Sequence, residues 1–122
     1  MSKAGRVALI GSGEYLPEMS EFERDLLDAG GSELFIQIPT AAGRESTSRI
    51  SYWKELGREQ AERIGAKQIF LPIFNREDAL REDLAELING AGLIYLSGGD
   101  PHYLASTLMD TPIYDAIIRN WQ

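Results

Sequence analysis

Two short glycine-rich segments hold most of the residues in this sequence that could do chemistry. The first, residues 11–14, carries Ser12 and Glu14, and the second, residues 97–100, carries Ser97 beside paired glycines. A serine hydroxyl can act as a nucleophile when a neighbouring base takes its proton, and a glutamate can be that proton acceptor. Both segments are therefore candidates for a site of nucleophilic chemistry.

The second segment also predicts a place for negative charge. Asp100 suits the N-cap of a helix, and Pro101 suits its first position. Such a helix start would aim the backbone N–H groups near Gly98 and Gly99 into the crevice beyond the preceding strand. There they could hold an anion or a developing oxyanion. An ordinary turn from a strand into a helix would favour the same residues, so both interpretations stay open.

Two further motifs are less specific. His102, the one histidine of the chain, could act as a base, but its predicted position on a first helical turn is typical of a surface residue. The first glycine segment is not a dinucleotide-binding fingerprint, because Leu16 stands where that motif requires glycine. A small-anion or nucleotide-binding role remains an alternative.

Alternating strands and helices are predicted to position these turns. Apolar runs at residues 7–10, 34–38, 68–71 and 93–96 indicate strands, and helical patterns lie between them. The alternation predicts one α/β domain over residues 1–122, a three-layer α/β/α sandwich with a parallel sheet of about four strands. With strands numbered along the chain, the order 3-2-1-4 would place the two glycine turns side by side. The flavodoxin-like order 2-1-3-4 is the alternative.

The composition excludes several classes of function. The net charge of -7, from 19 acidic and 12 basic residues, argues against binding to nucleic acid or to an anionic membrane surface. The absence of cysteine excludes disulfides and thiolate chemistry, and a single histidine excludes a multi-histidine metal centre. We expect no metal and no cofactor. The start of the chain is too polar for a signal peptide, so we expect a cytoplasmic protein.

Three segments together resemble the dipeptidase E/cyanophycinase family of serine peptidases, which has the class I glutamine amidotransferase-like fold. They are residues 7–14, 38–42 and 94–101, followed by Leu104 and Leu108. In that family the paired glycines after the fourth strand supply the oxyanion hole, a role that the resemblance gives here to Gly98 and Gly99. The family's nucleophilic serine follows in a Gly-x-Ser-Ala-Gly elbow on the next strand, with a histidine and an acid further on.

That elbow does not occur in this sequence, and the resemblance covers roughly the first half of a family member. We therefore expect a non-catalytic or vestigial peptidase-like domain that is truncated before its nucleophile. The alternative is a small hydrolase with a rebuilt site, which would use Ser12 or Ser97 together with Glu14 and the Gly98-Gly99 nest.

Self-association is expected at the fourth predicted strand. Its residues are apolar toward both faces, and the order 3-2-1-4 leaves the strand at an edge of the sheet, where unpaired backbone groups favour pairing with another chain. The predicted homodimer would use this strand and the last helix. The residues concerned are Leu93, Ile94, Tyr95, Leu96, Ile113, Ile117, Ile118 and Trp121. A last helix that folds back over its own edge would instead leave a monomer.

Overall fold

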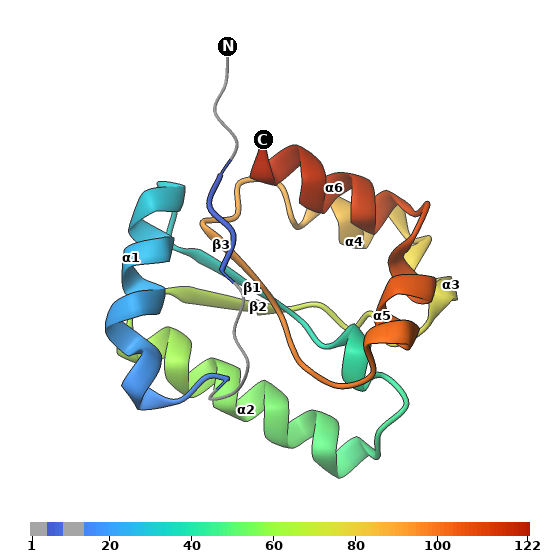
Figure 1. Ribbon diagram of the computed structural model, residues 1–122, viewed down its shortest axis with the longest axis horizontal. Coiled ribbons are helices and arrows are strands. Elements are labelled where there is room, and N and C mark those ends of the chain that lie inside the picture. Colours follow the sequence, from blue (N-terminus) through green and yellow to red (C-terminus); the bar gives the residue numbers. More distant parts are fainter. Residues whose placement is uncertain (1–4, 9–13) are drawn as a thin grey trace.

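Three parallel strands form the sheet at the centre of the computed structural model, which describes residues 5–8 and 14–122 (Figure 1). The strands are β1 (Leu34–Ile38), β2 (Lys67–Phe70) and β3 (Leu93–Leu96), in the order β2-β1-β3. Ile36 of β1 lies opposite Ile69 of β2 and Ile94 of β3, so β1 is paired on both sides. The predicted α/β fold with a parallel sheet is confirmed.

Helices connect and flank these strands. They are η1 (Pro17–Met19), α1 (Ser20–Gly30), η2 (Thr40–Ala42), α2 (Thr47–Arg63), α3 (Arg76–Ala79), α4 (Glu82–Glu86), α5 (Pro101–Leu108) and α6 (Pro112–Trp121), where η marks a 3-10 helix. Among the residues described, every helix is too short or too polar to cross a lipid bilayer.

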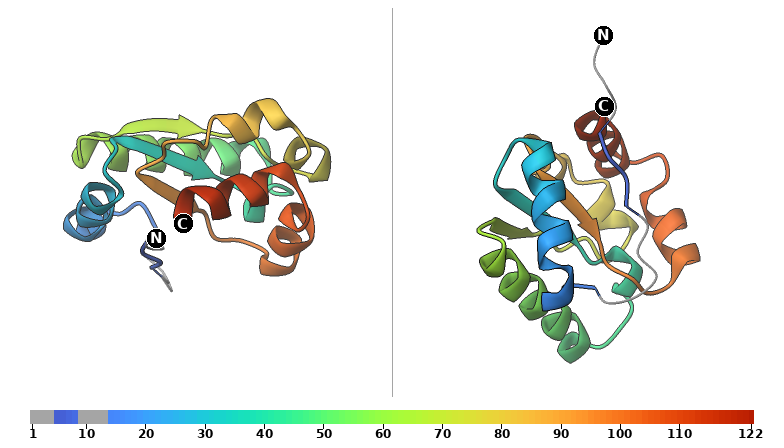
Figure 2. Two further views of the ribbon diagram at one scale, coloured as in Figure 1. Left: turned by 90° about the horizontal axis from the view of Figure 1, so that it is seen from above. Right: turned by 60° about the vertical axis from the view of Figure 1, so that its left-hand side comes forward.

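Alternate residues of β1 enter two different apolar clusters. Phe35 packs with Leu27 of α1 and Ala61 of α2, whereas Ile36 and Ile38 pack with residues of α4 and α6. Successive side chains of a strand point to opposite faces, so the two clusters lie on the two sides of the sheet. The same arrangement is visible in the ribbon, with α1 and α2 on one side of the strands and α4 and α6 on the other (Figures 1 and 2).

The number and order of the strands differ from the prediction. The sheet of the described residues has three strands and not about four, and residues 34–38 pair directly with both other strands, which fits neither 3-2-1-4 nor 2-1-3-4. Val7 and Ala8 of the predicted first strand lie outside the sheet, and Val7 is 67% exposed. The rest of that predicted strand lies outside the described residues. An apolar run marks a strand but carries no information about its neighbours, which is why the predicted order was wrong.

Side-chain caps fix the starts of several helices, including the one predicted at Asp100. The side chains of Asn75, Asp100 and Thr111 each accept a hydrogen bond from a backbone amide of the helix that they precede. Helix α1, which begins at Ser20, has no side-chain cap, and the Ser20 hydroxyl instead donates to Gln60 of α2. Tertiary contact has therefore replaced local capping at that end.

Candidate functional site

The turn over residues 97–100 lies where the carboxyl ends of β3 and β1 meet. The Ser97 amide donates to the Ile38 carbonyl oxygen, at the end of β1, and the Asp100 amide donates to the Ala41 carbonyl oxygen at 2.9 Å. Ligands of open α/β sheets bind beyond the carboxyl ends of the strands. The turn therefore occupies the part of this fold where a binding or catalytic site is expected.

Glycine is needed at position 99 of the turn, and at position 98 it leaves room for a neighbouring side chain. Gly99 has φ +150°, which side-chain-bearing residues rarely adopt, and a Cβ atom there would overlap the Ala41 carbonyl group. A Cβ atom on Gly98 would lie 2.7 Å from the Glu14 carboxylate. The absence of side chains therefore lets two other segments, the one at Glu14 and the one at Ala41, approach the turn closely.

Asp100 fixes the turn to the helix that follows. One carboxylate oxygen accepts hydrogen bonds from the amides of His102 and Tyr103, and the other lies 2.7 Å from Nη2 of Arg44. The amide of Tyr103, then that of His102 and the Arg44 guanidinium hold the pKa of Asp100 below its ordinary value. The Arg44 guanidinium also lies over the Tyr103 ring, 4.2 Å from its centre. The predicted cap is confirmed.

Glu14 reaches the same turn from the other side. Its Oε2 atom accepts a hydrogen bond from the Gly98 amide at 2.5 Å. The amide that would stabilise an oxyanion thus already holds a carboxylate of the same chain. Glu14 and Asp100 together place two negative groups at this turn.

Ser97 lies behind the turn and out of contact with solvent. It is 2% exposed, and its hydroxyl is hydrogen-bonded to the phenol of Tyr15, which is itself fully buried. Burial raises the pKa of the Tyr15 phenol above its ordinary range, so this phenol stays neutral and does not take a proton from Ser97 at neutral pH. The geometry makes Ser97 a structural hydroxyl rather than an activated one.

A buried polar cluster continues inward from Tyr15. The Tyr15 ring stacks on Tyr95 of β3 with ring centres 4.2 Å apart, and the fully buried Glu23 of α1 accepts a hydrogen bond from Gln60 of α2. Burial raises the pKa of the Glu23 carboxyl to about 7, although Gln60 and Arg63 act in the opposite direction. Within the described part of the chain, Glu23 Oε2 and the Tyr95 hydroxyl have no hydrogen-bond partner.

The structure brings together five of the candidate residues from the sequence, Glu14, Ser97, Gly98, Gly99 and Asp100. Ser12 lies outside the described residues. His102 contributes its backbone amide to the Asp100 cap, and no hydrogen bond joins its imidazole to Ser97 among the residues described. Sequence reasoning missed Tyr15 and Glu23. The one available signal was that Glu23 falls among the apolar residues of its helix, but its position after Ser20 also fitted a capping role.

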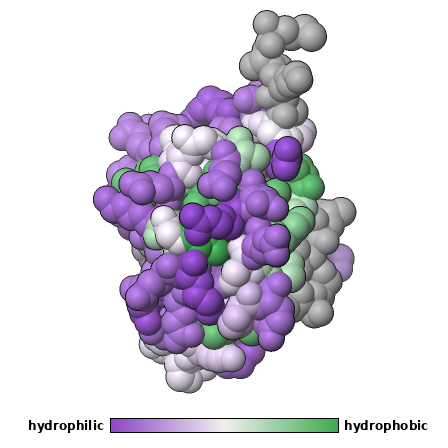
Figure 3. Space-filling model, turned by 90° about the vertical axis from the view of Figure 1, so that its left-hand side faces the viewer, coloured by the Kyte–Doolittle hydropathy of each residue, from purple (hydrophilic) through white to green (hydrophobic). Residues whose placement is uncertain are grey.

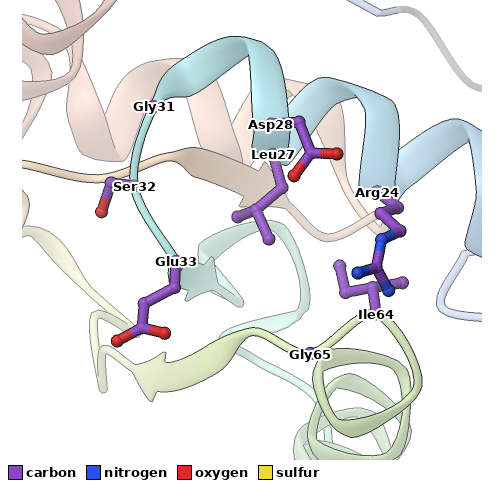
Figure 4. A pocket seen from close by; sticks show the side chains of 8 residues that line it. All are labelled: Arg24, Leu27, Asp28, Gly31, Ser32, Glu33, Ile64 and Gly65. Atoms are coloured by element: carbon purple, nitrogen blue, oxygen red, sulfur yellow. The ribbon is translucent and has the colours of Figure 1, made fainter.

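A hollow of about 460 Å³ lies at the opposite end of the sheet from this turn. Its lining comes from α1 and from the segments just before β1 and β2, and Figure 4 shows the carboxylates of Asp28 and Glu33 and the Arg24 guanidinium around it. The one hydroxyl of its lining, that of Ser32, accepts a hydrogen bond from the Leu34 amide. In residues 5–8 and 14–122 no three potential metal ligands converge on one point.

Comparison with known proteins shows a likeness to a solved peptidase structure. No family model and no curated protein matches the chain. A solved structure described as a peptidase from an acI-B1 Actinobacterium superposes on it with a TM-score of 0.94 and 53% sequence identity. The match covers 97% of this chain and 50% of that protein's chain, so this chain spans half the length of the peptidase that it resembles. The resemblance to a peptidase is therefore shown for this half.

Proposed function

We propose that this chain is the oxyanion-binding half of a serine-peptidase-like fold of the dipeptidase E/cyanophycinase type, and that it does not hydrolyse peptides by itself. The likeness to a peptidase supports the first part. The turn at Gly98 and Gly99 supports it further, because it lies beyond the carboxyl ends of β3 and β1, where a reacting carbonyl group would lie, and its Gly98 amide already holds a carboxylate.

One observation carries the second part of the proposal. Nucleophilic catalysis needs a serine whose proton passes to a nearby base. Ser97 is buried, and its partner Tyr15 is a phenol with a raised pKa that stays protonated. Among the residues that the structure describes, the carboxylate of Glu14 is engaged by the Gly98 amide and by no serine hydroxyl. This arrangement favours a binding turn without a nucleophile over a hydrolase rebuilt around Ser97.

In a longer protein of this kind, the other half would supply the nucleophile. The solved peptidase is about twice as long as the matched region, and β3 is paired on one side among the described residues. We propose that further strands continue the sheet beyond β3 and complete a three-layer sandwich. The nucleophile would then stand opposite the Gly98–Gly99 turn.

As an isolated unit the chain is proposed to form a homodimer through the same edge. Leu96 at the end of β3 is 42% exposed and Trp121 at the end of α6 is 38% exposed. By contrast, the face on the α1 side is mostly hydrophilic, with hydrophobic residues scattered over it (Figure 3). A two-fold partner that adds its own β3 would cover the edge that is unpaired among the described residues.

The test of the proposed function is an assay for turnover together with a covalent probe. We expect the isolated chain to hydrolyse neither Asp-containing dipeptides nor cyanophycin-like substrates. We also expect no labelling by a serine-directed fluorophosphonate. Turnover or labelling that disappears in Ser97→Ala or Ser12→Ala would overturn the proposal and favour the rebuilt hydrolase. Stabilisation by nucleotides in a thermal-shift panel would instead support a nucleotide-binding module.

A further inference from the structure

We propose that the Glu14 carboxylate blocks the turn from within the same chain. While it is bound to the Gly98 amide, external oxyanions and carboxylates cannot bind that amide until the Glu14 side chain moves away. This inference rests on the proposed function, because it concerns the regulation of the same turn. It begins from the position of one carboxylate.

The contact between Glu14 and the turn is close and directed. Glu14 Oε2 accepts from the Gly98 amide at 2.5 Å, and Oε1 lies 2.7 Å from the position that a Cβ atom on Gly98 would take. Both oxygens of the carboxylate therefore lie against the glycine. A hydrogen bond from an amide to a charged carboxylate is stronger than one between neutral groups. The carboxylate takes the place that the negatively charged oxygen of a reacting peptide would need.

The backbone that carries Glu14 is held in place by the next residue. Tyr15 has φ +61°, a left-handed conformation that is uncommon for a residue with a side chain and persists where the surroundings enforce it. Its phenol is bonded to Ser97, and its carbonyl oxygen accepts from Arg63 of α2 at 3.2 Å. The side chain and the carbonyl group of Tyr15 are therefore both held by hydrogen bonds. These two bonds fix the backbone next to Glu14, so the Glu14 side chain reaches the turn from a fixed position.

A tethered carboxylate is a strong competitor for a single amide. A ligand on a short tether acts at an effective concentration of roughly millimolar or more, so a free carboxylate has to reach comparable concentrations to displace it. Asp100 adds a second negative group at the turn, but its carboxylate is already paired with the Arg44 guanidinium and accepts hydrogen bonds from the first amides of α5. Removing the Glu14 carboxylate is therefore the change that should free the amide.

The experiment compares the Gly98 amide in the unmodified chain and three variants by NMR of the ¹⁵N-labelled protein, with acetate as the probe. In Glu14→Ala we expect the Gly98 amide proton to move upfield, because it loses its carboxylate partner. We expect acetate to shift this resonance at a concentration at least about tenfold lower than in the unmodified chain. Glu18→Ala is the matched control, because it removes the same charge from an exposed position four residues away and should behave like the unmodified chain.

Each outcome decides the question. An equal response to acetate in the unmodified chain and in Glu14→Ala, or no response in either, would overturn the inference. Glu14→Gln keeps the size of the side chain without its charge, and it should respond at intermediate acetate concentrations even if the alanine variant folds poorly. The hydrolysis assay separates the two proposals. Turnover by the isolated chain would reject the proposed function, whereas an unresponsive Gly98 amide in an inactive chain would reject the role of Glu14 alone.

Discussion

Glu23 shows how a single side chain can depend on its surroundings for its protonation state. It lies fully buried on α1, and the groups that face it are Gln60 and Arg63 of α2 and Tyr95 of β3. Burial disfavours the charged carboxylate, and this effect exceeds the favourable contributions of Gln60 and Arg63. The pKa of Glu23 therefore rises from its ordinary value of 4.5 to about 7.

A raised pKa makes the stability of the fold depend on pH. Between pH 4.5 and about 7 the folded chain binds the Glu23 proton more tightly than the unfolded chain does, so the free energy of unfolding should fall as the pH rises through this window. In Glu23→Gln this fall, of up to about 3 kcal/mol, should be absent. Urea denaturation of both proteins across the window would measure it. Glu21→Gln, an exposed change on the same helix, should keep the fall, and an unaltered fall in Glu23→Gln would contradict the assignment.

At the scale of elements, the connection from β3 to α5 depends on the backbone of Gly99. We expect Gly99→Ala to lower the free energy of unfolding by about 1–3 kcal/mol, since it adds strain at φ +150° and an overlap with the Ala41 carbonyl group. Gly31→Ala provides the comparison, because Gly31 also has a positive φ, +73°, but has no atom within 4 Å of the added Cβ. Thermal unfolding should show a larger loss for Gly99→Ala. Equal losses of stability in Gly99→Ala and Gly31→Ala would mean that the structure shifts to relieve the overlap with the Ala41 carbonyl group.

The sequence predicted the positions of strands along the chain better than it predicted which strands pair with each other in the sheet. Residues 34–38 and 93–96 are strands within the predicted bounds because apolar runs between turn residues report burial directly. The helical pattern between the last two predicted strands is divided into α3 and α4, since such a pattern does not reveal a break at Leu80 and Arg81. Strand order depends on contacts between distant segments, which no local pattern encodes.

The local features of the candidate site could be predicted from the sequence, whereas its contacts between distant segments could not. The cap at Asp100 and the glycines before it follow from local backbone chemistry, and they could be read from their residue types. The contact of Glu14 with Gly98 and the bond of Tyr15 with Ser97 join residues from opposite ends of the chain. Tertiary packing alone creates such pairs.

At the scale of the whole molecule, the edge of β3 that is unpaired among the described residues makes oligomeric state the property to measure. We expect the isolated chain to scatter light as a dimer at micromolar concentration and Leu96→Lys to be monomeric, because a charge on the exposed end of β3 would disfavour pairing. Leu80→Lys is the control, since Leu80 is 52% exposed on the connection between α3 and α4. A monomeric mass for the unmodified chain would reject the dimer. Ile94 is less suitable for this test because it packs against the core.

The central place of β1 has a consequence for how the chain folds during synthesis. Both of its partners come later in the sequence, and each is reached through a helical crossover, so β1 leaves the ribosome before either partner exists. Non-local parallel pairing of this kind is slow, and it leaves an apolar strand exposed in the meantime. Phe35 and Ile36, which are fully buried in the finished fold, would be the residues most in need of protection by a chaperone until Leu96 has been translated.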